Sequence, residues 1–338
     1  MSNKRSRKRR PQPRPRPEST ELELDDTVED EPEAEPTPRE RRPGWFGSAM
    51  FASGPSPMPS LGRSVGRGML TVAAQPVLVV VTIVLVTVTW FALLAIGFEG
   101  SPGRLVDVLA LPPVSTYFDL GTGNSLFGVG PSFLIFIGVA LVLRTLAFSV
   151  LSGMILEALE DGRVSTYGAL RGLRAIPTVL AVQVLSFSVI VAGNLIFPIL
   201  GPGIGFLGFV AALVAGLFFL GFAPTAAIRE GRPVIEELRR SSRAAMLPNA
   251  KHLVLCSLYF FLALPVVVGF APGGTSITAN PTLLTWVFAF VVNVIHLGFM
   301  AAFAYRWVVA EDAVPEEPVR RRAPARAPSA KARARPRR

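Results

Sequence analysis

Long apolar stretches alternate with short polar ones through most of this chain. Six stretches approach or exceed the roughly 20 residues of helix that a bilayer core of about 30 Å requires. They cover residues 70–98, 132–156, 178–200, 204–228, 252–271 and 283–310. Lipid offers no hydrogen bonds to the backbone, so stretches of this kind must be helical. The pattern predicts an all-α, polytopic membrane bundle of six transmembrane helices.

Charged residues concentrate at the two ends of the chain. Only 17% of all residues are charged, against about 25% in soluble domains. The first end is rich in Pro, Arg and Glu, and the second is rich in Arg, Ala and Pro. Neither composition supports a packed core. We therefore expect disordered cytoplasmic tails at 1–68 and 311–338, flanking a transmembrane domain over 69–310.

The loops between the apolar stretches differ in basic residues. Arg and Lys gather before the first stretch, in 157–177, in 229–251 and after the last stretch. The intervening loops hold one arginine or none. Cytoplasmic loops carry an excess of Arg and Lys. The alternation predicts a multi-pass protein of the cell membrane with both termini in the cytoplasm.

Two of the basic loops carry similar sequences. The first polar segment, DGRVSTYGALRGLRA, covers 161–175, and the second polar segment, EGRPVIEELRRSSRA, covers 230–244. A Gly-Arg pair follows an acid at the start of both, and two further arginines and an alanine recur at matching places. Each segment lies between two apolar stretches. This context predicts an internal duplication of a helix–polar segment–helix unit.

The arginines of the two polar segments are candidate contacts for lipid headgroups. They are Arg163, Arg171, Arg174, Arg232, Arg239, Arg240 and Arg243. Juxtamembrane arginines are attracted to anionic lipid by about 1 kcal/mol each. The alternative is that they only set the orientation in the membrane, and the sequence leaves both interpretations open.

The second polar segment also carries a family resemblance. Ala223-Pro224, Glu230-Gly231-Arg232 and Leu238-Arg239-Arg240-Ser241 occur there in order. This motif resembles the six-helix membrane domain attached to some bacterial glycerophosphodiester phosphodiesterases, and its stand-alone relatives. The sequence departs from that pattern after Ser242, where the family usually continues with aromatic residues. The resemblance implies a six-helix architecture and no phosphodiesterase activity.

Polar residues inside the apolar stretches form a second candidate site. Arg144 lies near the middle of its stretch, where a charge costs about 2.5–3.5 kcal/mol on insertion scales and usually faces the bundle interior. Asn293 and His296 lie at similar depth, three residues apart on one helix face. We expect these three side chains to form one polar cluster. It would serve either as a packing clamp between helices or as part of a transport path.

Catalytic and metal chemistry has little support in the composition. The chain has two histidines and one cysteine, from which neither a zinc site nor a nucleophile–histidine pair can be assembled by spacing. We therefore expect no enzyme and no cofactor. The leading prediction is a lipid-associated scaffold or accessory subunit. Its partners would be anionic membrane lipids, and a protein bound through the charged tails, but not nucleic acid. The alternative is a small-molecule or lipid transporter with a midplane polar site.

Overall fold

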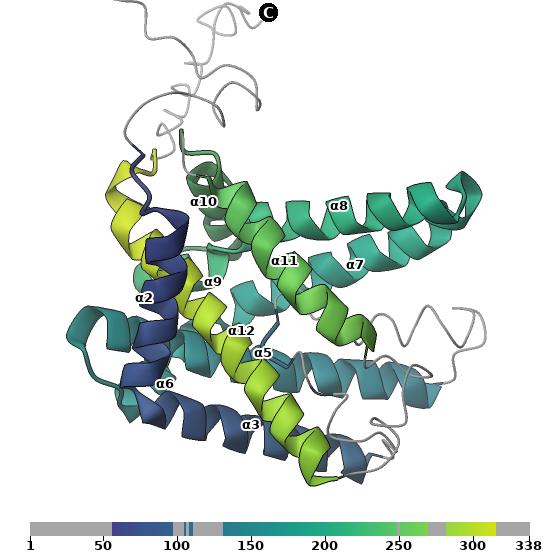
Figure 1. Ribbon diagram of the computed structural model, residues 1–338, viewed down its shortest axis with the longest axis horizontal. Coiled ribbons are helices and arrows are strands. Elements are labelled where there is room, and N and C mark those ends of the chain that lie inside the picture. Colours follow the sequence, from purple (N-terminus) through teal and green to yellow (C-terminus); the bar gives the residue numbers. More distant parts are fainter. Residues whose placement is uncertain are drawn as a thin grey trace, which may run out of the picture. The chain divides into compact units, whose positions relative to one another are not determined.

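The computed structural model describes residues 56–96, 105, 108–110, 131–248, 251–269 and 282–315. Every regular element in this part of the chain is a helix (Figure 1). In chain order the helices are α2 Leu61–Ala74, α3 Pro76–Ala95, α5 Pro131–Asp161, α6 Thr166–Gly172, η2 Leu173–Ala175, α7 Ile176–Leu200, α8 Pro202–Leu220, α9 Ala223–Glu230, α10 Val234–Ala245, α11 His252–Gly269, α12 Leu283–Ala310 and η4 Glu311–Ala313. The all-α prediction is confirmed for these residues. Most of both expected tails lies outside them.

Five helical segments are long and apolar enough to cross a membrane. They are Pro76–Ala95, Gly138–Asp161, Thr166–Val189, Val210–Glu230 and Leu283–Ala313. The stretch expected as the fifth span forms α11, within which His252–Leu262 is a shorter apolar helix. The prediction of several membrane-spanning helices is therefore supported by length and composition, and a sixth span stays a prediction.

The first expected span, 70–98, is wrong in detail because the helix breaks at Gln75. Pro76 is the first residue of α3, and it disfavours helical geometry at the residue before it. Gln75 adopts φ −123° and ψ 79°. The preceding helix, α2, begins at Leu61, where the Ser60 hydroxyl accepts a hydrogen bond from the Arg63 N–H. Residues 61–68, expected as tail, are thus helical.

The boundary of the C-terminal tail also needs correction. Residues Glu311–Ala313 continue α12 as a turn of 3₁₀ helix. Val314 is only 4% exposed and packs with the apolar side chains of α8, α11 and α12. The chain therefore stays packed for at least four residues beyond the expected end of the transmembrane domain.

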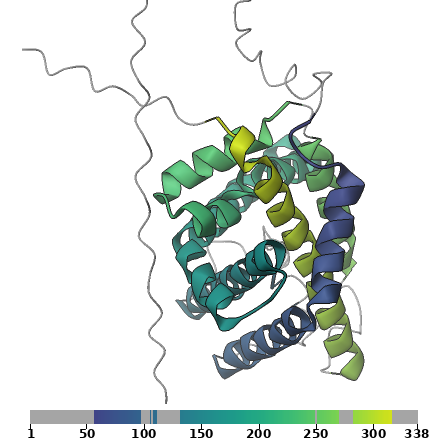
Figure 2. The ribbon, with the colours of Figure 1, turned by 90° about the vertical axis from the view of Figure 1, so that its left-hand side faces the viewer.

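Helix α2 lies along α12, as both views show (Figures 1 and 2). Gly68 makes this close approach possible, because a Cβ there would overlap the Gly298 carbonyl and lie 2.7 Å from the Ala302 nitrogen. Helices α7 and α8 run side by side in the opposite direction to each other. They are joined at Gly201, whose φ of 87° favours glycine.

The ends of several helices meet on one side of the bundle. The Gln75 amide donates a 2.8 Å hydrogen bond to the Gly162 carbonyl, which joins the start of α3 to the end of α5. Arg229, at the end of α9, forms ion pairs with Glu160 of α5 and Glu311 beyond α12. Both polar segments lie here. We call this the polar-segment side.

Candidate functional site: two polar segments and a pocket between the helices

The first polar segment folds back on the helix that precedes it. Helix α5 ends at Asp161, and Gly162 turns the chain with φ 70°. Glu157, which is 2% exposed, holds the next turn in place. Its carboxylate accepts hydrogen bonds from the Ser165 N–H (2.9 Å), the Ser165 hydroxyl (2.6 Å) and the Gly168 N–H (3.1 Å). A buried carboxylate thus satisfies the free N–H groups at the start of α6.

Glycines bring α6 against α5 at backbone distance. A Cβ on Gly153 would overlap the Gly168 carbonyl and lie 2.5 Å from the Gly172 backbone. A Cβ on Gly172 would overlap the Ser149 carbonyl. Small residues permit close approach of this kind between helices in membranes. The first polar segment is therefore fixed rigidly to the end of α5.

The second polar segment has a similar geometry at the end of α9. Gly231 ends the helix with φ 63°, and α10 follows. Glu237, which is fully buried, accepts a 2.8 Å hydrogen bond from the Arg232 N–H. Burial raises the pKa of Glu237 to about 7, against the lowering effect of that hydrogen bond, and the neighbouring charge of Glu230 also raises it. Glu237 is therefore a carboxyl group that titrates near neutral pH.

The fourth expected span, 204–228, is interrupted before α9. Pro224 lacks an N–H and disfavours a continuous helix. Helical hydrogen bonding is interrupted at Gly221–Phe222, although both residues keep right-handed helical dihedrals, and we call this point the α8–α9 break. Ser241 of α10 bonds to the backbone groups on either side of this point. Its hydroxyl donates to the Phe219 carbonyl (2.7 Å) and accepts from the Phe222 N–H (3.2 Å). The second polar segment thus supplies hydrogen-bond partners to the backbone at the break in the preceding helix.

Matched positions of the two polar segments make matched contacts. Gly172 of the first contacts the backbone of Gly153 in the preceding helix. Sixty-nine residues later, Ser241 takes the place of Gly172 and bonds to Phe222, which takes the place of Gly153. In each case the short helix folds back onto the helix before it at the same point.

A second pair of matched positions holds the buried carboxylates of the two polar segments, but on different helices. In the first segment Glu157 of the long helix faces Gly168 of the short one. The positions 69 residues later hold Ala226 and Glu237. The carboxylate therefore comes from the long helix in one segment and from the short helix in the other, with a small residue at the matching position.

Ion pairs fix several of the arginines that the sequence singled out. Glu160 binds Arg171 at 2.6 Å and Arg229 at 2.7 Å. Glu230 binds Arg232 at 2.8 Å and Arg240 at 2.9 Å. The side chains in these ion pairs are between 10% and 34% exposed. The pairs therefore form a network that joins helix ends, rather than isolated bridges on the surface.

Arg240 makes a second intramolecular contact, and Arg243 is also held within the protein. The Arg240 guanidinium lies 5.9 Å from the ring centre of Trp307 and is 8% exposed as a residue. Arg243 donates to the Pro315 carbonyl at 3.3 Å. Side chains held in this way have a structural role in the protein itself.

Arg163, Arg174 and Arg239 are exposed. Arg163 and Arg174 flank α6 in sequence, and that helix carries two exposed apolar side chains, Tyr167 (65%) and Leu170 (64%). The structure therefore divides the seven candidate arginines into four whose contacts hold the polar segments together and three that are exposed.

All three members of the expected polar cluster inside the bundle are buried, and their grouping stays a prediction. Arg144, Asn293 and His296 are 4%, 0% and 2% exposed. The Asn293 amide donates to the carbonyls of Leu105 and Ala289 and accepts from the Leu109 N–H.

His296 uses a different partner. Its Nδ1 lies 2.9 Å from the Tyr259 hydroxyl of α11. The contact that Asn293 makes was not predictable, because the 105–109 segment lies in a loop almost 190 residues away in sequence. Asn293 and His296 therefore clamp α12 to two different neighbours.

Helix α11 holds a histidine–cysteine contact that was not predicted from the sequence. His252 Nε2 lies 3.6 Å from Cys256 Sγ, and both residues are buried in α11. Their spacing of four residues was the available signal, since it places them on one helix face. Phe222 stacks on the His252 ring at 4.2 Å. The pair is fully buried, and the charge of the buried Arg306 acts on both residues.

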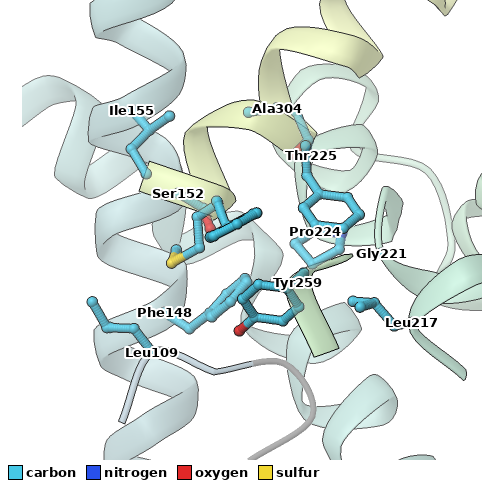
Figure 3. Close-up of a pocket in the computed structure, with 13 residues that line it drawn as sticks. Leu109, Phe148, Ser152, Ile155, Leu217, Gly221, Pro224, Thr225, Tyr259 and Ala304 are labelled. Atoms are coloured by element: carbon cyan, nitrogen blue, oxygen red, sulfur yellow. The ribbon is translucent and has the colours of Figure 1, made fainter. Parts of the chain in front are cut away.

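A pocket lies between α5, the α8–α9 break, α11 and α12 (Figure 3). It holds about 440 Å³ of space, including its open part. The lining is Leu109, Phe148, Ser152, Ile155, Leu217, Gly221, Pro224, Thr225, Tyr259, Phe299, Met300, Phe303 and Ala304. Arg144 is not among these residues. Apart from three hydroxyl groups the lining is apolar.

Groups of three or more metal-binding side chains do not occur among the described residues. Comparison with family models, with curated proteins and with solved structures gives no match to this chain. The resemblance to the six-helix domain of the phosphodiesterases therefore stays a prediction. What the geometry offers is a rigid pair of polar segments, a set of projecting arginines and an apolar pocket between helices.

Proposed function

We propose that this chain is a non-enzymatic, lipid-associated protein of the cell membrane, a scaffold or accessory subunit. Its two polar segments would touch anionic headgroups at the cytoplasmic surface. The observation that carries this proposal is the exposed face of α6, where Tyr167 and Leu170 lie between Arg163 and Arg174. Exposed apolar side chains flanked by arginines suit the boundary between headgroups and acyl chains.

Helix α10 has a smaller version of the same face. Ile235 is 65% exposed, and Arg239, one turn later, is exposed as well. The opposite face of α10 is buried through Glu237, Ser241 and Ala244. The helix is therefore amphipathic and anchored, with one apolar and one basic side chain on its exposed face.

The expected energy of this contact is modest. At about 1 kcal/mol per arginine near an anionic surface, Arg163, Arg174 and Arg239 together contribute about 3 kcal/mol. The arginines that bind Glu160 and Glu230 share those carboxylates in pairs, which partly offsets their charge. They stabilise the polar segments rather than adding to lipid attraction.

The matched contacts of the two polar segments support the rest of the proposal. They are those expected of an internal duplication, in which each polar segment closes a two-helix unit. Six spans with both termini in the cytoplasm follow from that arrangement and from the arginine-rich loops. Further partners would bind through the charged tails, and nucleic acid is not among those we propose.

A transporter with a midplane polar site has less support. Such a site would need a polar cavity that reaches Arg144. The pocket described above is mainly apolar and does not include Arg144. Asn293 bonds to backbone groups, and the Nδ1 of His296 lies against the Tyr259 hydroxyl of a neighbouring helix. An enzyme is disfavoured because Cys256 and its neighbour His252 are both buried, at 0% and 1% exposure, where a substrate from solution does not reach them.

The test compares thermal stability in two kinds of nanodisc, one of phosphatidylcholine alone and one that also contains phosphatidylglycerol. A lipid that binds only the native state stabilises it. The wild-type melting temperature should rise with phosphatidylglycerol. Replacing Arg163, Arg174 and Arg239 by Gln should remove most of that rise. An unchanged rise in the triple variant would rule out the proposed contact.

Two control variants identify the cause of any change. The triple Lys variant keeps the charge and should keep most of the dependence on phosphatidylglycerol. Arg171→Gln breaks the ion pair with Glu160. It should lower the melting temperature equally in both kinds of nanodisc, because this arginine serves the protein and not the lipid.

A further inference from the structure

Helix α2 has both of its ends on the polar-segment side of the bundle. Met58, just before the helix, packs in the same apolar cluster as Val314, which follows α12. The nearby Glu311 belongs to the ion pairs on this side. At the other end, the Gln75 amide donates to the Gly162 carbonyl, which follows α5. A helix whose two ends lie on the same side of a bundle runs across that side and does not cross to the opposite one.

The length of α2 agrees with this course. Its 14 residues extend over about 20 Å, whereas the hydrocarbon core of a bilayer is about 30 Å thick. Helix α3, which follows directly, has 20 residues and is one of the segments long enough to cross a membrane. The break at Gln75 therefore separates a short helix across the polar-segment side from a candidate membrane span.

One face of α2 is packed against the bundle and another is exposed. The buried residues are Ser64, Gly68, Thr71 and Val72. Arg63, Arg67 and Leu70 are exposed, and their spacing of four and three residues places them on one face of the helix. Figure 2 shows α2 at the rim of the bundle, with α12 on its inner side. The exposed face is therefore open to the surroundings of the bundle.

The charge of this exposed face is not balanced by acidic residues. The sequence has no Asp or Glu between Glu40 and Glu99. In the part of the chain that the structure describes, neither Arg63 nor Arg67 forms an ion pair. Leu70, one turn after Arg67, is 63% exposed. Two arginines beside an exposed apolar side chain match the boundary between the headgroups and the acyl chains of an anionic bilayer.

We infer that α2 lies in the plane of the membrane at the headgroup level of the polar-segment side, where Arg63 and Arg67 bind the phosphate of an anionic phospholipid. The two guanidinium groups are one helical turn apart, so both can reach the same phosphate, and arginine binds phosphate oxygens through paired N–H donors. Leu70 then enters the edge of the acyl layer. This inference rests on the proposed function, because that function takes the polar-segment side as the headgroup surface. It adds a third contact, from a helix outside both polar segments.

Depth measurements test the orientation of α2. Gly62 and Ala73 are exposed, and their separation of 11 residues places them on the same face, about 16 Å apart along the axis. A cysteine is placed at one of these positions at a time and labelled with bimane in nanodiscs that contain phosphatidylglycerol. Nitroxides at known depths on the lipid acyl chains quench the label and report its depth. Both labels should lie at the same depth, near the headgroups. The unsubstituted protein, in which Cys256 is buried, gives the background.

Helix α3 supplies the matched control for depth. Val77 and Val88 are also 11 residues apart, and they are 48% and 52% exposed. Because α3 is a candidate span, labels at these positions should differ in depth by most of the same distance of about 16 Å. A difference between Gly62 and Ala73 as large as that of the α3 pair would overturn the inference. Labels at Gly62 and Ala73 that no lipid nitroxide quenches would overturn it as well.

A second experiment tests the charge of α2, through the rise in melting temperature that phosphatidylglycerol causes in nanodiscs. With equal weight for each exposed arginine, replacing Arg63 and Arg67 by Gln should remove about two fifths of the rise that they share with the three exposed arginines of the polar segments. The double Lys variant should keep the rise. Gly66→Ala, which changes the same helix without changing its charge, should keep it too. A full rise in the double Gln variant would overturn the lipid contact of α2.

Failure of this inference and failure of the proposed function have different signatures. A reduced rise in the double Gln variant of α2, together with a full rise in the triple Gln variant of the polar segments, would support the α2 contact and contradict the contacts of α6 and α10. The opposite pattern would contradict the α2 contact alone. A wild type without any rise would contradict both.

Discussion

Replacing Ser241 by alanine should destabilise the protein far more than the same change at the neighbouring Ser242. The Ser241 hydroxyl makes two hydrogen bonds to the backbone at the α8–α9 break, and the residue is fully buried. Alanine would leave the Phe219 carbonyl and the Phe222 N–H without these partners. A buried backbone group that loses its partner costs about 1–3 kcal/mol. We expect a loss of about 2–4 kcal/mol in the free energy of unfolding.

Ser242 is the matched control in the same turn of α10. Its hydroxyl donates to the Leu238 carbonyl of its own helix, at 2.9 Å. That carbonyl keeps its place in the helix without the hydroxyl, and back-bonding of this kind slightly destabilises helices. Ser242→Ala should therefore change the free energy of unfolding by less than about 0.5 kcal/mol.

The chain offers a convenient reporter for this comparison. Cys256 is its single cysteine and is fully buried. A maleimide that fluoresces on reaction with a thiol will report its exposure during heating. The expected loss corresponds to a melting temperature lower by roughly 4–16 °C for Ser241→Ala. Equal melting temperatures for the two variants would refute the role assigned to Ser241.

Three further variants test the polar segments and their packing. Glu157→Ala should cost about 2–4 kcal/mol, because three donors lose their acceptor; the thiol assay would show no shift if this carboxylate were dispensable. Gly153→Ala should be strongly destabilising through overlap with α6, whereas Gly66→Ala, with open space around it, should be neutral or slightly stabilising. Equal melting temperatures of these two variants would contradict the packing account. Glu237 binds a proton more tightly in the folded state than in the unfolded one, so the free energy of unfolding should fall by up to about 3 kcal/mol between pH 4.5 and 7 and then level off. Glu237→Gln should flatten this slope in equilibrium unfolding followed by intrinsic fluorescence, and a slope equal to that of the wild type would exclude Glu237 as its source.

The membrane-spanning segments were predictable because their signal is local. Apolar length alone located the helices, and the two glycines that end them in the polar segments stood out by their context. The breaks at Gln75 and at Gly221–Phe222 were not predicted, although Pro76 and Pro224 are visible in the sequence. Proline is tolerated inside transmembrane helices when neighbours satisfy the backbone. Whether a break forms therefore depends on partners such as Ser241.

The sequence identified the arginines of the candidate site together, but not the role of each one. Spacing and charge identified the arginines of the polar segments, but could not separate Arg171, which binds Glu160, from Arg174, which is exposed. That division depends on how helices pack after folding. The pocket left no local signal either, since its lining comes from five separate parts of the chain.

The most direct test of the central claim is a density map of the protein in nanodiscs that contain phosphatidylglycerol. We expect α6 and α10 at one surface of the bilayer. Headgroup density should lie beside Arg163 and Arg174, next to Tyr167. The same density should be weak in a map of the triple Gln variant. A map in which the exposed faces of α6 and α10 point away from the lipid, with headgroups bound elsewhere, would contradict the account.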